Sequence, residues 1–195
     1  MTERAHLRDL PAGVDPSPLD PDLDVFRPPE AQRSALRDIA SDPRGHVVVA
    51  EEDDRTVGYV TFHPPGAFER WGADRTGRLI ELGAIEVAPA MRGSHLGERL
   101  LEAAFRGGRY DATVVFATLY AWHYDLDRSG LGPLGYRRLL ERLYAKAGLT
   151  AMPTSDPEVR ADPANALLAR IGPDAPEEVR GEFQRLRTLP PEAGP

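Results

Sequence analysis

The 195-residue chain contains no cysteine and no long apolar run. Without cysteine, disulfide bonds, thiol nucleophiles and thiolate metal sites are excluded. A membrane-spanning helix needs about 18 consecutive apolar residues, and no run approaches that length. The residues at the start of the chain also lack the apolar core of a signal peptide. We therefore expect a cytoplasmic protein with no membrane partner.

Lysine is nearly absent as well, because Lys146 is the only lysine and arginine carries the remaining positive charge. The formal net charge of −7 argues against nucleic acid as the main partner.

His123 and Asp125 are the best candidates for a pair of metal ligands. Two residues are too few to indicate a site, so we expect no metal.

Apolar spacing predicts alternating strands and helices in one domain. We expect an N-terminal arm over residues 1–25, a folded domain over 26–188 and a flexible tail over 189–195. Expected strands cover residues 46–51, 56–63, 78–88, 111–122 and 149–154, and expected helices cover 29–40, 94–105, 135–148, 162–172 and 176–187. Within the 162–172 helix, Asp162 would be the N-cap, Pro163 the first residue and Gly172 the residue past the end. This alternation predicts an α/β fold with a mixed sheet.

The stretch MRGSHLG, residues 91–97, joins an expected strand to an expected helix. Amides at a helix start have no partner within the helix and carry partial positive charge, which favours an anion. Glycine lets the backbone approach a phosphate, and Arg92 adds a cation whose shape suits phosphate oxygens. The alternative is a plain turn with a surface arginine. The pattern is neither a P-loop nor a dinucleotide fingerprint.

A hairpin, a strand ending in V-x-P and a following R-G-x-x-L-G resemble the GNAT superfamily of acetyl-CoA-dependent N-acetyltransferases. The family motif is Q/R-x-x-G-x-G/A, and His95 stands here in place of its first glycine. The resemblance implies a GNAT fold, with a central mixed, mostly antiparallel sheet and helices on both faces, and acetyl-CoA as co-substrate. The cofactor-binding residues that it implies are Val87, Arg92, Gly93, Ser94, His95, Leu96, Gly97 and Asn165.

Longer segments are similar to one branch of this superfamily, the acetoin-utilisation acetyltransferases. They are FRPP (26–29), VGYVTF (57–62), ERW (69–71), LIELGAIEVAPAMRG (79–93), WHYDL (122–126) and ADPANALLARIG (161–172). The resemblance implies a protein lysine acetyltransferase that acetylates and inactivates AMP-forming acetyl-CoA synthetase. We expect a monomer or a homodimer. Two other classes stay open: a small-molecule amine acetyltransferase, and a non-catalytic regulator that binds acetyl-CoA and a partner protein.

Transfer to lysine requires a base, because an ammonium with a pKa of about 10.4 is almost fully protonated near neutral pH. A carboxylate can remove the proton. Glu81 and Glu86 lie in the strand before the 91–97 loop, and alternation puts them on opposite faces. Glu86 is favoured because it adjoins Val87, whose backbone amide polarises the thioester carbonyl in the family. Glu81 is the second candidate, and either glutamate could instead be solvated or structurally paired.

In the family, a tyrosine in a late helix, a few residues before a glycine, often protonates the leaving thiolate. If the 162–172 segment is that helix, the position falls on Leu168 and no tyrosine matches. Tyr120, Tyr124 or His123 could serve, or the thiolate could leave unassisted.

Asn165 resembles a family asparagine that bonds the pantetheine arm, although a helix-surface or capping role is the alternative. Four residues are the candidates for substrate binding, with ordinary packing as the alternative: Trp71, Trp122, His123 and Tyr124.

Overall fold

The computed structural model describes residues 5–190. The chain forms two compact units. Unit 1 consists of Met1–His63 and Leu82–Gly107, and unit 2 consists of Pro64–Glu81 and Gly108–Pro195. Most of the predicted tail and the first four residues of the predicted arm lie outside the described residues.

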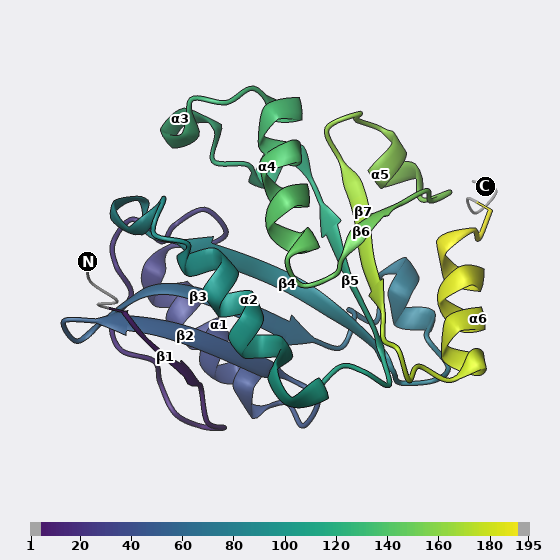
Figure 1. Cartoon of the computed structure of the whole chain (residues 1–195), viewed down its shortest axis with the longest axis horizontal. Coiled ribbons are helices and arrows are strands. Elements are labelled where there is room, and N and C mark those ends of the chain that lie inside the picture. The colour runs from purple at the N-terminus through teal and green to yellow at the C-terminus, as the bar shows by residue number, and fades with distance from the viewer. Residues whose placement is uncertain (1–4, 191–195) are drawn as a thin grey trace. The chain divides into compact units, whose positions relative to one another are not determined.

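Seven strands form a sheet in the order β1-β2-β3-β4-β5-β7-β6 (Figure 1). The strands are β1 (His6–Asp9), β2 (His46–Glu52), β3 (Arg55–His63), β4 (Leu79–Val87), β5 (Val114–Leu119), β6 (Thr150–Met152) and β7 (Ala166–Ile171). The helices are α1 (Pro29–Ser41), α2 (Leu96–Phe105), α3 (Leu126–Ser129), α4 (Pro133–Ala145), α5 (Pro157–Arg160) and α6 (Glu177–Arg187). Strands β4 and β5 pair in parallel, whereas β1–β2, β2–β3, β5–β7 and β6–β7 pair antiparallel. The predicted mixed, mostly antiparallel α/β sheet is confirmed.

In unit 1, the predicted hairpin is present as β2 and β3, with Glu52 opposite Arg55. Asp53 and Asp54 form the turn with φ angles of 48° and 61°, the left-handed backbone that tight hairpins need. Helices α1 and α2 pack on opposite faces of these strands (Figure 1). The buried face of α2 consists of Leu96, Leu100, Leu101 and Ala104, which is the predicted apolar face.

The segment before α1 also packs into unit 1. Strand β1 pairs with β2, and Leu19 forms a bridge to Thr56. Leu19 and Leu23 are both buried. From residue 5 onward, the predicted arm is therefore integrated into the sheet and its core, and the boundary at residue 26 stays a prediction.

Unit 2 has its own core around β5, β7 and α6. Trp71, from the β3–β4 loop, packs on Phe116 with ring centroids 4.5 Å apart and on Phe183 at 5.5 Å. The other buried members of this cluster are Leu79, Val114, Leu167, Ala169, Val179 and Leu186. The loop that precedes β4 is thus fixed to the sheet by an aromatic stack.

The predicted helix over residues 162–172 is wrong, because residues 166–171 form strand β7 between β5 and β6. A short apolar run buried on both faces gives no periodicity that separates strand from helix. Asp162 accepts a hydrogen bond from the Ala164 amide at 2.7 Å, so the predicted cap residue forms a turn. Gly172 donates to the Thr113 carbonyl, and an added Cβ would lie 2.2 Å from the Asp111 carbonyl oxygen. Close backbone approach, and not a helix end, explains that glycine.

Candidate active site

The predicted anion-binding loop of unit 1 has the expected shape. Gly93 has a φ of 80°, and an added Cβ there would meet no atom within 4 Å. His95 occupies the N-cap of α2 with a φ of 59°. Histidine enters this left-handed region more readily than most residues, so it can replace the family glycine without changing the path of the backbone.

The start of α2 is open to a ligand. The first bond of the helix runs from the Arg99 amide to the His95 carbonyl, and no side chain in the described part of the chain caps the helix. The amides of Leu96, Gly97 and Glu98 therefore precede the first intrahelical bond. Ser94 is exposed, and its amide and hydroxyl both donate to the Met91 carbonyl. Arg92 is exposed beside this turn.

Glu86, at 6% exposure, is held by partners within unit 1. One carboxylate oxygen accepts from the Val25 amide at 2.9 Å, and the other accepts from the Tyr59 hydroxyl at 2.5 Å. Burial, together with the negative charge of Glu86, raises the pKa of Tyr59 far above its ordinary value, so the hydroxyl keeps its proton and donates. Both carboxylate oxygens are thus engaged in joining β3, β4 and the segment before α1.

Glu81, in the part of β4 that belongs to unit 2, has a different environment. Burial, and then the nearby negative charge of Glu69, raise its pKa to about 7. A carboxylate with this pKa accepts a proton much more strongly than an ordinary glutamate and is still partly ionised near neutral pH. The raised pKa of Glu81 suits a general base. The two hydrogen bonds of Glu86 instead fit the alternative of a structurally paired glutamate.

Helix α4, which follows β5, contains a tyrosine that the sequence reasoning missed. Tyr144 lies four residues before Gly148, which is the spacing expected of the thiolate-protonating tyrosine. It is 4% exposed, and burial raises its pKa above the ordinary value. Within residues 5–190 its hydroxyl has no hydrogen-bond partner, yet no fully buried side-chain oxygen or nitrogen there lacks one. The hydroxyl therefore reaches accessible space. The Tyr-x3-Gly spacing is visible in the sequence at residues 144–148, whereas the late helix was predicted at residues 162–172.

The four predicted substrate-binding residues have different environments. Trp71 is buried in the core of unit 2, so the structure does not support its assignment to substrate. Tyr124 donates to the Ala164 carbonyl at 2.7 Å and stacks on Tyr136, which indicates a packing role. Trp122 is 65% exposed, and His123 lies beside it with ring centroids 5.9 Å apart. Only Trp122 and His123 present accessible rings.

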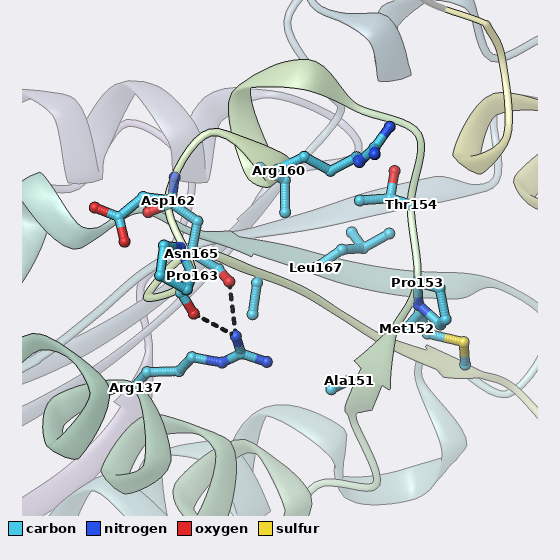
Figure 2. A pocket seen from close by; sticks show the side chains of 12 residues that line it. Arg137, Ala151, Met152, Pro153, Thr154, Arg160, Asp162, Pro163, Asn165 and Leu167 are labelled. Carbon is cyan, nitrogen blue, oxygen red and sulfur yellow. Dashed lines mark hydrogen bonds between the residues drawn. The ribbon is translucent and has the colours of Figure 1, made fainter.

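Asn165 lies in the turn before β7 and not on a helix. Its carbonyl oxygen accepts from the Ala121 amide at 2.8 Å, and its amide group donates to the Glu158 carbonyl at 3.0 Å. It also lines a cavity of about 330 Å³ (Figure 2). In this cavity, Arg137 donates to the backbone carbonyls of Pro163 and Asn165. Asn165 thus joins the end of β5 to α5, and its contact with pantetheine stays a prediction.

No three histidine, aspartate or glutamate side chains between residues 5 and 190 are grouped so that they could hold a metal ion. No helix in that part of the chain combines the length and apolar character needed to cross a membrane.

Comparison with known proteins agrees with these features. Residues 17–122 match the acetyltransferase (GNAT) family. The acetoin utilization protein AcuA of Bacillus subtilis (strain 168) is 41% identical over 166 residues, which cover 85% of this chain and 79% of that protein. AcuA of Bacillus licheniformis is 39% identical over the same shares.

A crystal structure of an acetoin utilization protein from Exiguobacterium sibiricum 255-15 is 34% identical and has a TM-score of 0.87. The match covers 94% of this chain and 95% of that one. The whole fold, and not only the motif around α2, is therefore shared. The chain belongs to the GNAT family of N-acetyltransferases.

Proposed function

We propose that this enzyme is a cytoplasmic, acetyl-CoA-dependent protein lysine acetyltransferase that acetylates and inactivates AMP-forming acetyl-CoA synthetase. Relatives that cover most of the chain are named for acetoin utilization, which supports a role in the same metabolism. The observation that carries the proposed chemistry is Glu81, whose pKa of about 7 suits the removal of a proton from an amine.

Unit 1 supplies the residues for the donor. The uncapped amides at the start of α2 suit the diphosphate of acetyl-CoA, and Arg92 adds a full positive charge. Acetyl-CoA supplies an acetyl thioester when it is bound. Val87, the last residue of β4, keeps the role that the family resemblance gives it, which is polarisation of the thioester carbonyl by its amide.

Unit 2 supplies the residues for proton transfer. Glu81 accepts the proton of the lysine ammonium, which leaves a neutral amine. The amine nitrogen then bonds to the acetyl carbon, the carbon–sulfur bond breaks, and the sulfur leaves as a thiolate while the nitrogen loses its second proton to solvent. We assign the protonation of that sulfur to the Tyr144 hydroxyl, which has no partner among the described residues and would regain its proton from solvent. We assign a contact with the acceptor to Trp122, whose aromatic ring is accessible.

Incubation of the enzyme with acetyl-CoA and purified acetyl-CoA synthetase tests this proposal. We expect one acetyl group on a lysine of the synthetase, detected by mass spectrometry, and a matching loss of synthetase activity. A synthetase that stays unmodified while a small amine is acetylated would instead establish a small-molecule acetyltransferase. A stable complex with the synthetase, without acetyl transfer, would indicate the non-catalytic regulator.

A further inference from the structure

Three segments of unit 2 come together around Tyr120, which follows β5. Its hydroxyl donates to Glu158 of α5 at 3.3 Å. Its ring stacks on Trp122, with centroids 4.2 Å apart and planes 11° apart. The β3–β4 loop reaches the same place, because its Arg70 lies 3.5 Å from Asp156, the N-cap residue of α5.

Two large apolar side chains on these segments are exposed. Phe68 has a relative exposure of 106% and Trp122 of 65%, the two highest values among the large exposed apolar residues. Exposed aromatic rings that are grouped together are typical of interaction sites. The stacked pair of Tyr120 and Trp122 forms a flat platform, and Phe68 stands in the loop that precedes Trp71.

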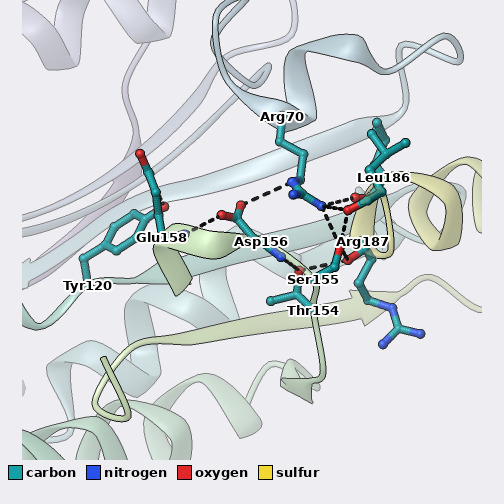
Figure 3. A network of polar contacts seen from close by, with 9 residues as sticks. Arg70, Tyr120, Thr154, Ser155, Asp156, Glu158, Leu186 and Arg187 are labelled. Atoms are coloured by element: carbon teal, nitrogen blue, oxygen red, sulfur yellow. Dashed lines mark hydrogen bonds and ion pairs between the residues drawn. The ribbon is translucent and has the colours of Figure 1, made fainter. Parts of the chain in front are cut away.

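The position of Phe68 is held by the residues that follow it. Trp71 is buried in the core, and Arg70 donates to the Ser155 hydroxyl and to the carbonyls of Leu186 and Leu189 (Figure 3). Arg70 also lies 3.5 Å from Asp156. Arg70 and Trp71 thus anchor the segment directly after Phe68, so the exposed ring of Phe68 belongs to a turn whose position is fixed.

The charges of this surface are negative. Neither Glu69 nor Glu158 forms an ion pair within the described chain, whereas the charge of Arg70 is met by Asp156. The negative charge of Glu69 also acts on Glu81, the proposed base. Glu69 therefore lies near the proposed site of proton transfer. Carboxylates beside exposed aromatic rings recognise cations, through charge and through cation–π contact.

We propose that Phe68 and the stacked pair of Tyr120 and Trp122 form the docking surface for a basic, lysine-bearing loop of the protein substrate, with Glu69 and Glu158 providing the complementary charge. This inference rests on the proposed function and adds the surface that selects a protein acceptor. A second copy of the chain would present the same carboxylates and be repelled, and the phosphates of nucleic acid would be repelled too.

Acetyl transfer to purified acetyl-CoA synthetase tests the surface, with Phe68→Ala and the double variant Phe68→Ala/Trp122→Ala. Truncation of an aromatic anchor costs more than about 1 kcal/mol of binding, so we expect KM for the synthetase to rise about fivefold or more in Phe68→Ala and further in the double variant. Phe68→Ala should acetylate N-α-acetyl-lysine amide at the wild-type rate, because this acceptor is too small to reach the surface. Leu139→Ala, which truncates an exposed leucine of α4, is the matched control and should keep the wild-type KM for the synthetase.

The outcomes separate the two proposals. Wild-type KM values for the synthetase in both Phe68 variants would overturn the docking surface and leave the proposed function intact. An equal loss with the small acceptor would also overturn it, because Phe68 would then affect the chemistry or the fold. A wild-type enzyme that does not modify the synthetase would overturn the proposed function, and the docking surface with it.

Discussion

At the scale of single residues, the two glutamates of β4 show how environment decides role. Glu86 is buried with both carboxylate oxygens hydrogen-bonded, whereas Glu81 has a raised pKa and no such pair of donors among the described residues. The sequence predicted a carboxylate in this strand and favoured Glu86. From the structure we propose Glu81 as the base instead. Rates of acetyl transfer by Glu81→Gln and Glu86→Gln will decide between the two glutamates.

The raised pKa of Glu81 has a consequence for stability. In the unfolded chain its pKa is near 4.5, and in the folded protein it is about 7, so folding disfavours the ionised form. The stability associated with the protonated group is fully present below pH 4.5 and is lost as pH rises through 7. We expect Glu81→Gln to raise the melting temperature at pH 8 by more than at pH 5. Glu102→Gln, at an exposed position of α2, should show no such pH dependence, and equal shifts for the two variants would contradict the assignment.

Glu86 should matter chiefly for folding. In Glu86→Ala, the Val25 amide and the Tyr59 hydroxyl lose their acceptor in a buried place. Each unsatisfied group costs about 1–3 kcal/mol, so the free energy of unfolding should fall by roughly 2–6 kcal/mol in urea titrations. Tyr59→Phe removes one donor and leaves the other bond intact, so its loss should be smaller. A Glu86→Ala protein of wild-type stability would show that these bonds do not hold the segment before α1.

At the scale of elements, the start of α2 is the feature that the sequence predicted best. The strand, the loop and the helix follow from apolar spacing, and Gly93 and His95 have the positive φ that such a loop requires. Strand β7 is the opposite case. Its six residues are enclosed by β5 and β6, so its conformation is decided by partners distant in sequence, and the turn at Asp162 looked like a helix cap. Because the late helix was predicted at residues 162–172, the tyrosine of α4, Tyr144, was not among the predicted site residues.

Arg92→Ala should weaken coenzyme A binding. A charge-assisted hydrogen bond contributes about 1.5–3 kcal/mol, so loss of the guanidinium should raise Kd about tenfold or more in calorimetric titrations. Arg44→Ala, which removes an exposed arginine from the turn before β2, should leave Kd unchanged. Equal Kd values for Arg92→Ala and the wild type would argue against a diphosphate at the start of α2.

Gly172→Ala tests the backbone path at the end of β7. Its Cβ would lie 2.2 Å from the Asp111 carbonyl oxygen and 2.5 Å from that of Tyr110, so the backbone would have to shift. We expect a loss of about 1–3 kcal/mol of stability, the usual cost of overpacking. Gly181→Ala, in the open middle of α6, should instead gain about 0.5–1 kcal/mol. A stabilised Gly172→Ala protein would mean that β7 does not approach residues 110 and 111.

At the scale of the whole molecule, the proposed roles fall on both units. Unit 1 contains the helix start proposed to bind the diphosphate, and unit 2 contains the proposed base, the tyrosine proposed to protonate the thiolate and the proposed docking surface. The sequence predicted the sheet class and the family because their signals are local motifs. Partners such as Val25 for Glu86, or Glu69 for Glu81, are far apart along the chain or act through burial, so only the structure could reveal them.

The dependence of acetyl transfer on pH, with the synthetase as acceptor, tests the central claim most directly. We predict that the wild-type rate rises with pH through about 7, as Glu81 loses its proton, and then levels off. General-base help contributes about 10²–10⁴-fold, so Glu81→Gln should be slower by about 100-fold or more and should lose this inflection, while Glu86→Gln keeps it. A Glu81→Gln enzyme with the wild-type rate and pH profile would contradict the account.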